Sequence, residues 1–300
     1  MLMKKNFIIV TGGAGFVGSN LIQHLLKLKK FKIISIDNYS SGSSINHINH
    51  KDVKYLRCET KDIKKKLFNI KNKINAIFHF GEFARIYQSF KKFDKCFEYN
   101  SIGSMEVFKF CLENKIKLIY SATSASLGNR GRDKNLSPYA YTKAKNLELI
   151  ENLKKWFNFK CEIIYFYNVY GPRQISIGDM ATVIGIFENQ YKQNKPLTVV
   201  KPGTQSRRFT HIDDTIKVCI EAWKRNKNLH YSILSKKSYS ILEVAKLFKS
   251  KIKYFPKRPG ERYASALTKM NLSNKIVRRY GKIQLTDYIK EILQNHSFTS

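Results

Sequence analysis

Short runs of branched apolar residues alternate with longer stretches of mixed polarity along the first half of the chain. Runs such as Ile33-Ile34-Ser35-Ile36 are apolar at almost every position, which is typical of strands covered on both faces. Strands are predicted at 6–10, 32–37, 53–57, 76–80, 117–121 and 161–167. Helices are predicted at 15–29, 93–114 and 139–157. This alternation predicts an α/β fold with a Rossmann-type doubly wound parallel sheet.

The rhythm changes after Asn168, where Gly and Pro residues separate shorter elements. Residues 1–168, with a returning segment near 212–235, are expected to form the sheet domain. Residues 169–300 are expected to form most of a smaller, partly discontinuous C-terminal substrate domain. Within it, Ser240 and Glu243 have capping-box spacing, which predicts a helix that begins near Ser240.

Composition narrows the class of protein. With 43% hydrophobic and 26% charged residues in 300, neither a disordered nor a fibrous protein fits. No apolar run approaches the roughly 20 residues that a bilayer requires, and the first run ends at Thr11, too early for a signal peptide. The five cysteines are widely spread, which supports neither a disulfide framework nor a metal cluster. A cytoplasmic protein without membrane contact or metal is expected.

The formal net charge of +33 is the extreme feature of the composition. Such a charge invites a nucleic-acid interpretation, because clustered Lys and Arg neutralise phosphates. The lysines are scattered, however, and no nucleic-acid-binding signature accompanies them. We therefore expect a solvated Lys-rich surface without a specific nucleic-acid partner, and a field that favours a small anionic substrate.

A glycine-rich segment, Gly12-x-x-Gly15-x-x-Gly18, follows the first predicted strand and opens the first predicted helix. Glycines there allow a tight turn and the close approach of a pyrophosphate to the helix N-terminus, which indicates a dinucleotide site. About 20 residues later, Asp37 can accept hydrogen bonds from ribose hydroxyls and would repel a ribose phosphate, which favours NAD over NADP. The alternative is that Asp37 only caps the turn at 37–42.

Two Tyr-x-x-x-Lys pairs overlap in one predicted helix, Tyr139 with Lys143 and Tyr141 with Lys145. Four-residue spacing on a helix brings a phenol and an ammonium to the same face. A nearby lysine stabilises a phenolate, so either pair could supply a general base. Spacing alone does not choose between them, and a surface pair is the other interpretation.

Six motifs in order, TGGAGFVG, DNYSSG, FHF with a later Asn, SPYAYTK, YNVYGPRQ and SRRFTHIDD, resemble the extended short-chain dehydrogenase/reductase family. The resemblance is to its NAD-dependent nucleotide-sugar epimerases and dehydratases, UDP-glucose 4-epimerase among them. It covers almost the whole chain. It implies an NAD cofactor, a nucleoside-diphosphate sugar substrate and a homodimer, assembled through the helices at 93–114 and 139–157.

The resemblance also implies roles for individual residues. Ser137-Pro138 before Tyr139 selects Tyr139 and Lys143 as catalytic, together with Thr123. Cofactor contacts are implied for Gly12, Gly15, Phe16, Val17, Asp37, Asn38, Ser41, Gly42, Glu59, Thr60, Phe80, Gly81, Asn100, Tyr139 and Lys143. Substrate contacts are implied for Thr123, Asn168, Arg207, Arg258 and Glu261.

Three departures from the family pattern bear on the reaction. Ser124-Ala125 stand where the 4,6-dehydratases carry Asp-Glu, which disfavours a dehydratase. The segment 128–139 is short, which leaves the sugar open. Phe80-Gly81-Glu82 replaces the customary Leu-Ala-Ala, with Arg85 following, and Arg208 replaces an aspartate. Glu82 and Arg85 could contact an unusual sugar substituent or pair with each other, and we favour the pairing.

These observations predict an NAD-dependent epimerase of a nucleoside-diphosphate sugar, acting at C4 through a 4-keto intermediate. The alternative is a nucleotide-sugar 4-dehydrogenase or reductase with net redox chemistry. A 4,6-dehydratase and a non-catalytic NAD- or RNA-binding scaffold are disfavoured. Among relatives of this kind, the usual setting is polysaccharide biosynthesis.

Overall fold

The eight-stranded parallel sheet forms the centre of the computed structural model, which describes residues 6–126, 134–257 and 276–297. Its strand order is β14-β11-β6-β5-β4-β1-β2-β3. The strands are β1 (Phe7–Thr11), β2 (Lys32–Asp37), β3 (Val53–Arg57), β4 (Ile74–His79), β5 (Lys117–Thr123), β6 (Cys161–Phe166), β11 (His230–Leu234) and β14 (Ile276–Tyr280). All pairings are parallel, and the chain order reverses beside β1, as in doubly wound folds. The predicted α/β class and sheet are confirmed.

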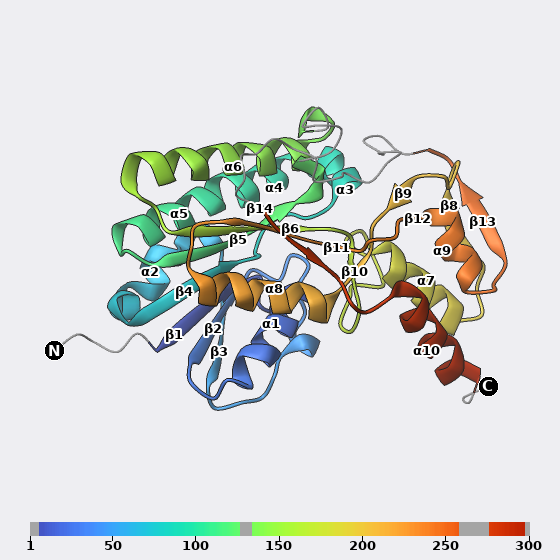
Figure 1. The fold of residues 1–300 in the computed structure, drawn as a ribbon, viewed down its shortest axis with the longest axis horizontal. Coiled ribbons are helices and arrows are strands. Elements are labelled where there is room, and N and C mark those ends of the chain that lie inside the picture. The colour runs from blue at the N-terminus through green and yellow to red at the C-terminus, as the bar shows by residue number, and fades with distance from the viewer. Residues whose placement is uncertain (1–5, 127–133, 258–275, 298–300) are drawn as a thin grey trace.

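Helices cover both faces of the sheet (Figure 1). One face carries α3 (Ile86–Lys91), α4 (Phe93–Phe97), α5 (Ser104–Glu113) and α6 (Pro138–Phe157), and the other carries α1 (Phe16–Leu26) and α8 (Ile212–Arg225). The strands are buried between these layers, which is why they are apolar at almost every position. Short α2 (Ile63–Leu67) packs against α5.

The predicted helix at 93–114 contains a π-helical segment, η4 (Glu98–Gly103), between α4 and α5. Asn100 lies in this segment and is fully buried. Its side chain accepts a hydrogen bond from the Phe83 amide at 2.6 Å and donates to Thr142 Oγ1 at 3.1 Å. Segments of this kind reposition single side chains, and here the amide is aimed at the chain that leaves β4.

A smaller region lies beyond the carboxyl ends of the strands (Figure 1). Its elements are β7 (Val169–Tyr170), α7 (Val183–Lys192), β8 (Leu197–Val200), β9 (Ser206–Arg207), β10 (Thr210–His211), β12 (Tyr239–Ser240), α9 (Ile241–Leu247), β13 (Ile252–Phe255) and α10 (Leu285–Ser297). They share an apolar core of their own. The capping box of Ser240 and Glu243 is present, as the sequence predicts.

None of the helices in the described parts of the chain has both the length and the apolar character needed to span a bilayer. The same described residues contain no group of three or more His, Cys, Asp or Glu side chains suited to hold a metal ion.

Candidate active site

A cleft of about 510 Å³ opens at the carboxyl ends of the strands, between the sheet and the smaller region. This is where ligands bind in open parallel α/β sheets. The sheet side contributes the glycine-rich segment, the ends of β2 and β5, and the first turns of α6. The smaller region contributes α7 and the segment that precedes it.

At two glycines of the segment, backbone atoms pack too closely to admit a side chain. Gly12 has a φ of +69°, and a Cβ there would lie 2.8 Å from the Phe80 carbonyl carbon. A Cβ at Gly18 would lie 2.1 Å from the Gly12 oxygen. Helix α1 begins beyond Gly15 without a side-chain cap or an acidic residue in its first turn, so its amide groups remain available to an anion.

Asp37 ends β2 at the cleft and is buried. Its carboxylate accepts hydrogen bonds from the Ala14 amide at 3.0 Å and the Tyr39 amide at 2.8 Å. Burial raises the pKa of Asp37, and these two amide bonds oppose that rise. Asp37 therefore does cap the turn, as the alternative interpretation has it. A carboxylate offers about four acceptor sites, so two remain for ribose hydroxyls. The segment and Asp37 fit a dinucleotide.

Most of the predicted cofactor contacts line the cleft, namely Gly12, Gly15, Phe16, Val17, Asp37, Asn38, Ser41, Glu59, Thr60, Phe80, Gly81, Tyr139 and Lys143. Asn38 donates to the Glu59 carboxylate at 3.0 Å, which holds both at the rim. Gly42 and Asn100 are not among the lining residues. Gly42 backs the Asp37 carboxylate, and the Asn100 amide is taken up by Phe83 and Thr142.

The structure separates the two Tyr-x-x-x-Lys pairs of α6. Tyr139 is 9% exposed and lines the cleft together with Lys143, whose side chain is 4% exposed. Tyr141 is 41% exposed, and Lys145 pairs with Glu148 at the surface. Only the first pair is placed to reach a ligand in the cleft.

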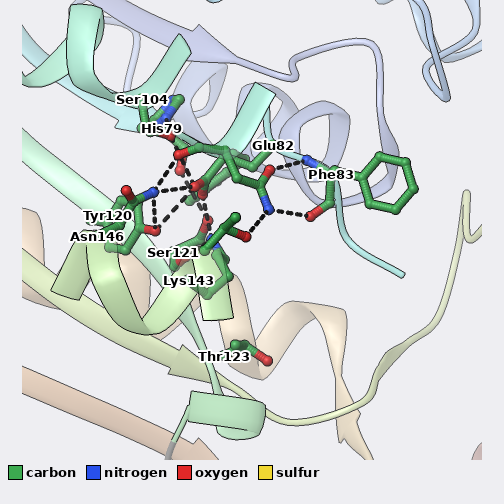
Figure 2. Close-up of polar contacts among 12 residues, drawn as sticks. His79, Glu82, Phe83, Ser104, Tyr120, Ser121, Thr123, Lys143 and Asn146 are labelled. Carbon is green, nitrogen blue, oxygen red and sulfur yellow. Dashed lines mark hydrogen bonds and ion pairs between the residues drawn. The ribbon is translucent and has the colours of Figure 1, made fainter. Parts of the chain in front are cut away.

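Lys143 forms a buried ion pair with Glu82, and its ammonium also donates to the Ser121 carbonyl (Figure 2). The expected pairing of Glu82 with Arg85 is wrong. Arg85 instead donates to the Met180 carbonyl, with its Nε at 2.8 Å, and so joins the wall of the cleft to the smaller region. Glu82 pairs with Lys143 because the ammonium lies directly against its carboxylate in the interior, where each charge needs a partner.

The other Glu82 oxygen accepts three hydrogen bonds (Figure 2). Ser104 Oγ and Tyr120 Oη donate at 3.0 Å each, and Asn146 Nδ2 donates at 3.1 Å. With a side chain that is 2% exposed, Glu82 is better described as part of the cleft floor than as a sugar contact. We name the residues Glu82, Ser104, Tyr120, Lys143 and Asn146 the buried network.

The charge of Lys143 is set by two opposing effects. Burial lowers the pKa of Lys143, and the negative charge and hydrogen bond of Glu82 raise it again. His79 forms hydrogen bonds with the hydroxyls of Thr11 and Ser104, one through each ring nitrogen. It is fully buried, and burial lowers its pKa to about 4. The imidazole is therefore neutral at pH 7, and the charges at this end of the cleft are those of the ion pair between Lys143 and Glu82.

Thr123 lies at the end of β5 and lines the cleft, away from the buried network in Figure 2. Its Oγ1 accepts a hydrogen bond from the Ala125 amide at 3.1 Å. The strand-end turn bond that the sequence allows as an alternative is thus present. The hydroxyl proton of Thr123 is still free to be donated, because that bond uses the oxygen as acceptor.

On the substrate side, Asn168 and Arg207 both line the cleft. Asn168 has a φ of +34° and donates to the Arg208 carbonyl at 3.1 Å. Arg208, which replaces a customary aspartate, donates to the Ser235 carbonyl at 2.5 Å and does not line the cleft. Arg258, Glu261 and the segment 129–133 lie outside the described residues.

Sequence reasoning missed part of the wall. The segment before α7, the first residue of α7 and the turn before β9 contribute the lining residues Ile175, Met180, Ala181, Thr182, Val183 and Gln205. Thr182 is recognisable afterwards as the cap of α7, since its hydroxyl accepts from the Gly185 amide at 3.0 Å. Ile175, Met180, Ala181 and Val183 carry no sequence signal, because apolar residues look alike whether they line a cleft or a core. Gln205 is a single polar residue in a turn and carries none either.

Comparisons with known proteins identify the family and the fold. Residues 8–234 match the profile described as the NAD dependent epimerase/dehydratase family. The chain is 32% identical over 226 residues to the "Uncharacterized UDP-glucose epimerase YtcB" of Bacillus subtilis, covering 70% of each chain. It is 29% identical over 264 residues to the ADP-L-glycero-D-manno-heptose-6-epimerase of Brachyspira hyodysenteriae, covering 81% of this chain and 80% of that protein.

Two solved structures share the fold over nearly their full length. One is the UDP-glucose 4-epimerase of Thermotoga maritima with UDP-glucose, at a TM-score of 0.84 and 22% identity, covering 98% of this chain and 99% of that one. The other is the UDP-N-acetylglucosamine 4-epimerase of Methanobrevibacter ruminantium M1, at a TM-score of 0.83 and 25% identity. The match covers 99% of this chain and 100% of that one.

Proposed function

Because the chain belongs to the NAD dependent epimerase/dehydratase family, we propose that it inverts C4 of a nucleoside-diphosphate sugar through a transient 4-keto sugar. The observation that carries this proposal is the position of Tyr139 and Lys143. They are buried in one cleft with a dinucleotide segment on one side and Arg207 on the other. A base, a hydride acceptor and an anion contact are the parts that this reaction needs.

NAD, when bound, supplies the chemistry of hydride removal and return. The glycine-rich segment and the N-terminus of α1 would hold its pyrophosphate, and Asp37 would hold its adenosine ribose. Asp37 would also repel a phosphate on that ribose, which favours NAD over NADP. Inversion returns the hydride, so the cofactor is not consumed and need not be exchanged.

Tyr139 is the residue that would remove the proton from O4 of the sugar. A phenol is a poor base at neutral pH unless a positive charge stabilises the phenolate, and Lys143 lies one helical turn away. Thr123 would share the O4 proton through the hydroxyl hydrogen that its turn bond leaves free. Arg207 and Asn168 would bind the diphosphate, for which the forked guanidinium is well suited.

The cleft lacks the pair of acidic groups that a 4,6-dehydratase needs next to the threonine. Ser124 and Ala125 occupy those positions, and both are buried. Among the described lining residues the carboxylates are Asp37, Glu59 and Glu82. Asp37 and Glu59 lie at the cofactor end, and Glu82 is bound to Lys143, so none is available to remove water across C5 and C6.

The experiment is incubation of the purified protein with a panel of UDP-, GDP- and dTDP-sugars, with products identified by NMR and NADH followed by absorbance. A C4 epimer without accumulation of NADH is the expected result. A persistent keto sugar with stoichiometric NADH would replace the proposal with a nucleotide-sugar dehydrogenase. Inversion at another carbon would keep the epimerase and correct the position.

We also propose a homodimer assembled through α4, α5 and α6. Apolar side chains on these helices and on η4 are exposed, among them Phe93, Ile102, Met105, Tyr141, Trp156 and Phe157. Phe97 contacts both Phe93 and Tyr141, with ring centroids 4.5 and 6.1 Å apart, so the apolar surface continues from α4 to α6. A continuous patch of this kind marks an association surface. Sedimentation at micromolar concentration should show twice the mass of 35.0 kDa.

A further inference from the structure

Glu82 is an unexpected charge in this cleft. The family that the chain resembles customarily has alanine here, which cannot pair with a lysine. In this structure the Glu82 carboxylate is bound to the ammonium of Lys143, and the two side chains are 2% and 4% exposed. A buried carboxylate costs several kcal/mol of desolvation unless it is paired and hydrogen-bonded, so its partners matter.

Both carboxylate oxygens of Glu82 are matched to donors. Oε2 faces Lys143, and Oε1 accepts from Ser104, Tyr120 and Asn146. These donors come from α6, α5 and β5, so the carboxylate is fixed from three sides (Figure 2). The arrangement leaves Glu82 one geometry, and that geometry fixes Lys143 between Glu82 and the Ser121 carbonyl.

We propose that Glu82 is a positioning residue that fixes the ammonium of Lys143 and offsets its charge, and that the Tyr139–Lys143 pair therefore works at higher pH than it would without this carboxylate. The inference rests on the proposed function, in which Tyr139 is the base. A negative charge close to two ionisable groups holds the proton on both of them. Removing that charge must make both groups more acidic.

The other acidic groups that face this pair do not supply a second negative charge near neutral pH, and His79 does not supply a positive one. His79 of β4 is neutral there, because burial lowers its pKa to about 4. Cys96 of α4 and Tyr120 of β5 also stay neutral, since burial raises the pKa of Cys96 to about 11 and that of Tyr120 well above its usual range. Arg85, before α3, is a second cation that acts electrostatically on Tyr139. Glu82 is thus the negative charge within the buried network.

The experiment compares wild type with Glu82→Gln and Glu82→Ala, which remove the charge, and with Tyr120→Phe as the matched control. Tyr120→Phe deletes one hydrogen bond of the same carboxylate but keeps the charge. The first measurement is kcat/KM against pH with the converted nucleotide sugar. The acid limb and the alkaline limb should both move to lower pH in the Gln and Ala variants, the alkaline limb by about one pH unit or more. Tyr120→Phe should leave both limbs in place.

The second measurement needs no substrate. The phenolate absorbance of the holoenzyme is titrated for wild type and for Glu82→Gln, each after subtraction of the same protein carrying Tyr139→Phe. The Tyr139 phenolate should form at lower pH without the carboxylate. This titration decides the inference even if no nucleotide sugar is converted, so failure of the proposed reaction stays distinguishable.

An equal loss of activity at every pH, with an unmoved phenolate titration, would overturn the inference and leave Glu82 as a structural anchor only. Movement of the limbs in Tyr120→Phe as large as in Glu82→Gln would also overturn it, because the charge would then not be the cause. Glu82→Ala keeps the test decisive if Glu82→Gln does not fold, since alanine is the customary residue of the family.

Discussion

The two Tyr-x-x-x-Lys pairs of α6 have the same composition and spacing, and they lie in opposite surroundings. A helix turns by about 100° per residue, so an offset of two residues carries the second pair to another face. Lys143 is buried against Glu82, whereas Lys145 meets Glu148 where the two side chains are 56% and 62% exposed. The motif is therefore informative only together with the face that carries it. The buried pair lies where a ligand in the cleft can reach it, and the exposed pair of the same letters does not.

The largest difference between the pairs should appear in turnover. Tyr139→Phe removes the proposed base and should lower kcat by about 10² to 10⁴. Tyr141→Phe removes an exposed hydroxyl and should leave kcat within about twofold of wild type. The measurement is turnover of the nucleotide sugar identified by the panel. Near-normal turnover by Tyr139→Phe would refute the assignment of the base.

A second difference should appear in the free energy of unfolding. Lys143→Met leaves Glu82 as an unpaired buried charge, which should cost about 3–5 kcal/mol in urea unfolding. Lys145→Met should not change the unfolding midpoint measurably, since its ion pair is exposed. Adding Glu82→Gln to Lys143→Met should recover part of the loss, which separates the buried charge from any loss of NAD binding. Additive losses in the double variant would show that the pair is not coupled.

The free energy of unfolding should also fall in acid because of His79, which lies behind Tyr139 and Lys143. His79 has a pKa lowered to about 4 by burial, so between pH 4 and about 6.5 the unfolded chain binds a proton that the folded chain does not. The contribution is fully present above about pH 6.5 and is lost as the pH falls to 4, by about 3 kcal/mol. His79→Asn should flatten this part of the unfolding profile. His50→Asn, at an exposed histidine, should keep the wild-type slope.

The smallest effect should be a change in dimer dissociation when Tyr141 of the exposed pair is replaced. Tyr141 contacts Phe97 within the proposed dimer face, and Tyr141→Ser should raise the dimer dissociation constant by about tenfold. Sedimentation over a dilution series measures this change, with Lys145→Ser as the control on the same face of the helix. If the wild-type chain is monomeric at all concentrations, the proposed dimer is wrong and the two variants cannot differ in association.

Much of the fold and of the candidate site could be predicted from the sequence alone, because local pattern and backbone geometry coincide there. The glycine-rich segment must follow a strand, Ser240 must cap a helix, and Asp37 must end the second strand, so each lies where its pattern places it. The choice of Tyr139 over Tyr141 needed the family resemblance, since spacing was identical. These features depend on neighbours within a few residues.

The partner of Glu82 could not be predicted in this way. Glu82 and Lys143 are 61 residues apart and meet only because β4 pairs with β5 and α6 packs against β5. A nearby cation, Arg85, was the obvious candidate in sequence, but its guanidinium donates to the Met180 carbonyl. The wall before α7 was missed for the same reason, as its position relative to the cleft depends on how two regions are joined.

The edge strand β14 is synthesised long after the strands that form the centre of the sheet. It pairs with β11, and Arg279 on it is held to Glu221 of α8 at 2.6 Å. The strands from β1 to β6 are complete once residue 166 has left the ribosome, whereas β14 is synthesised more than 100 residues later. Until then β11 presents an unpaired edge, which is the kind of surface that joins other chains. The growing polypeptide therefore exposes this edge of β11 from the synthesis of residue 234 until β14 emerges.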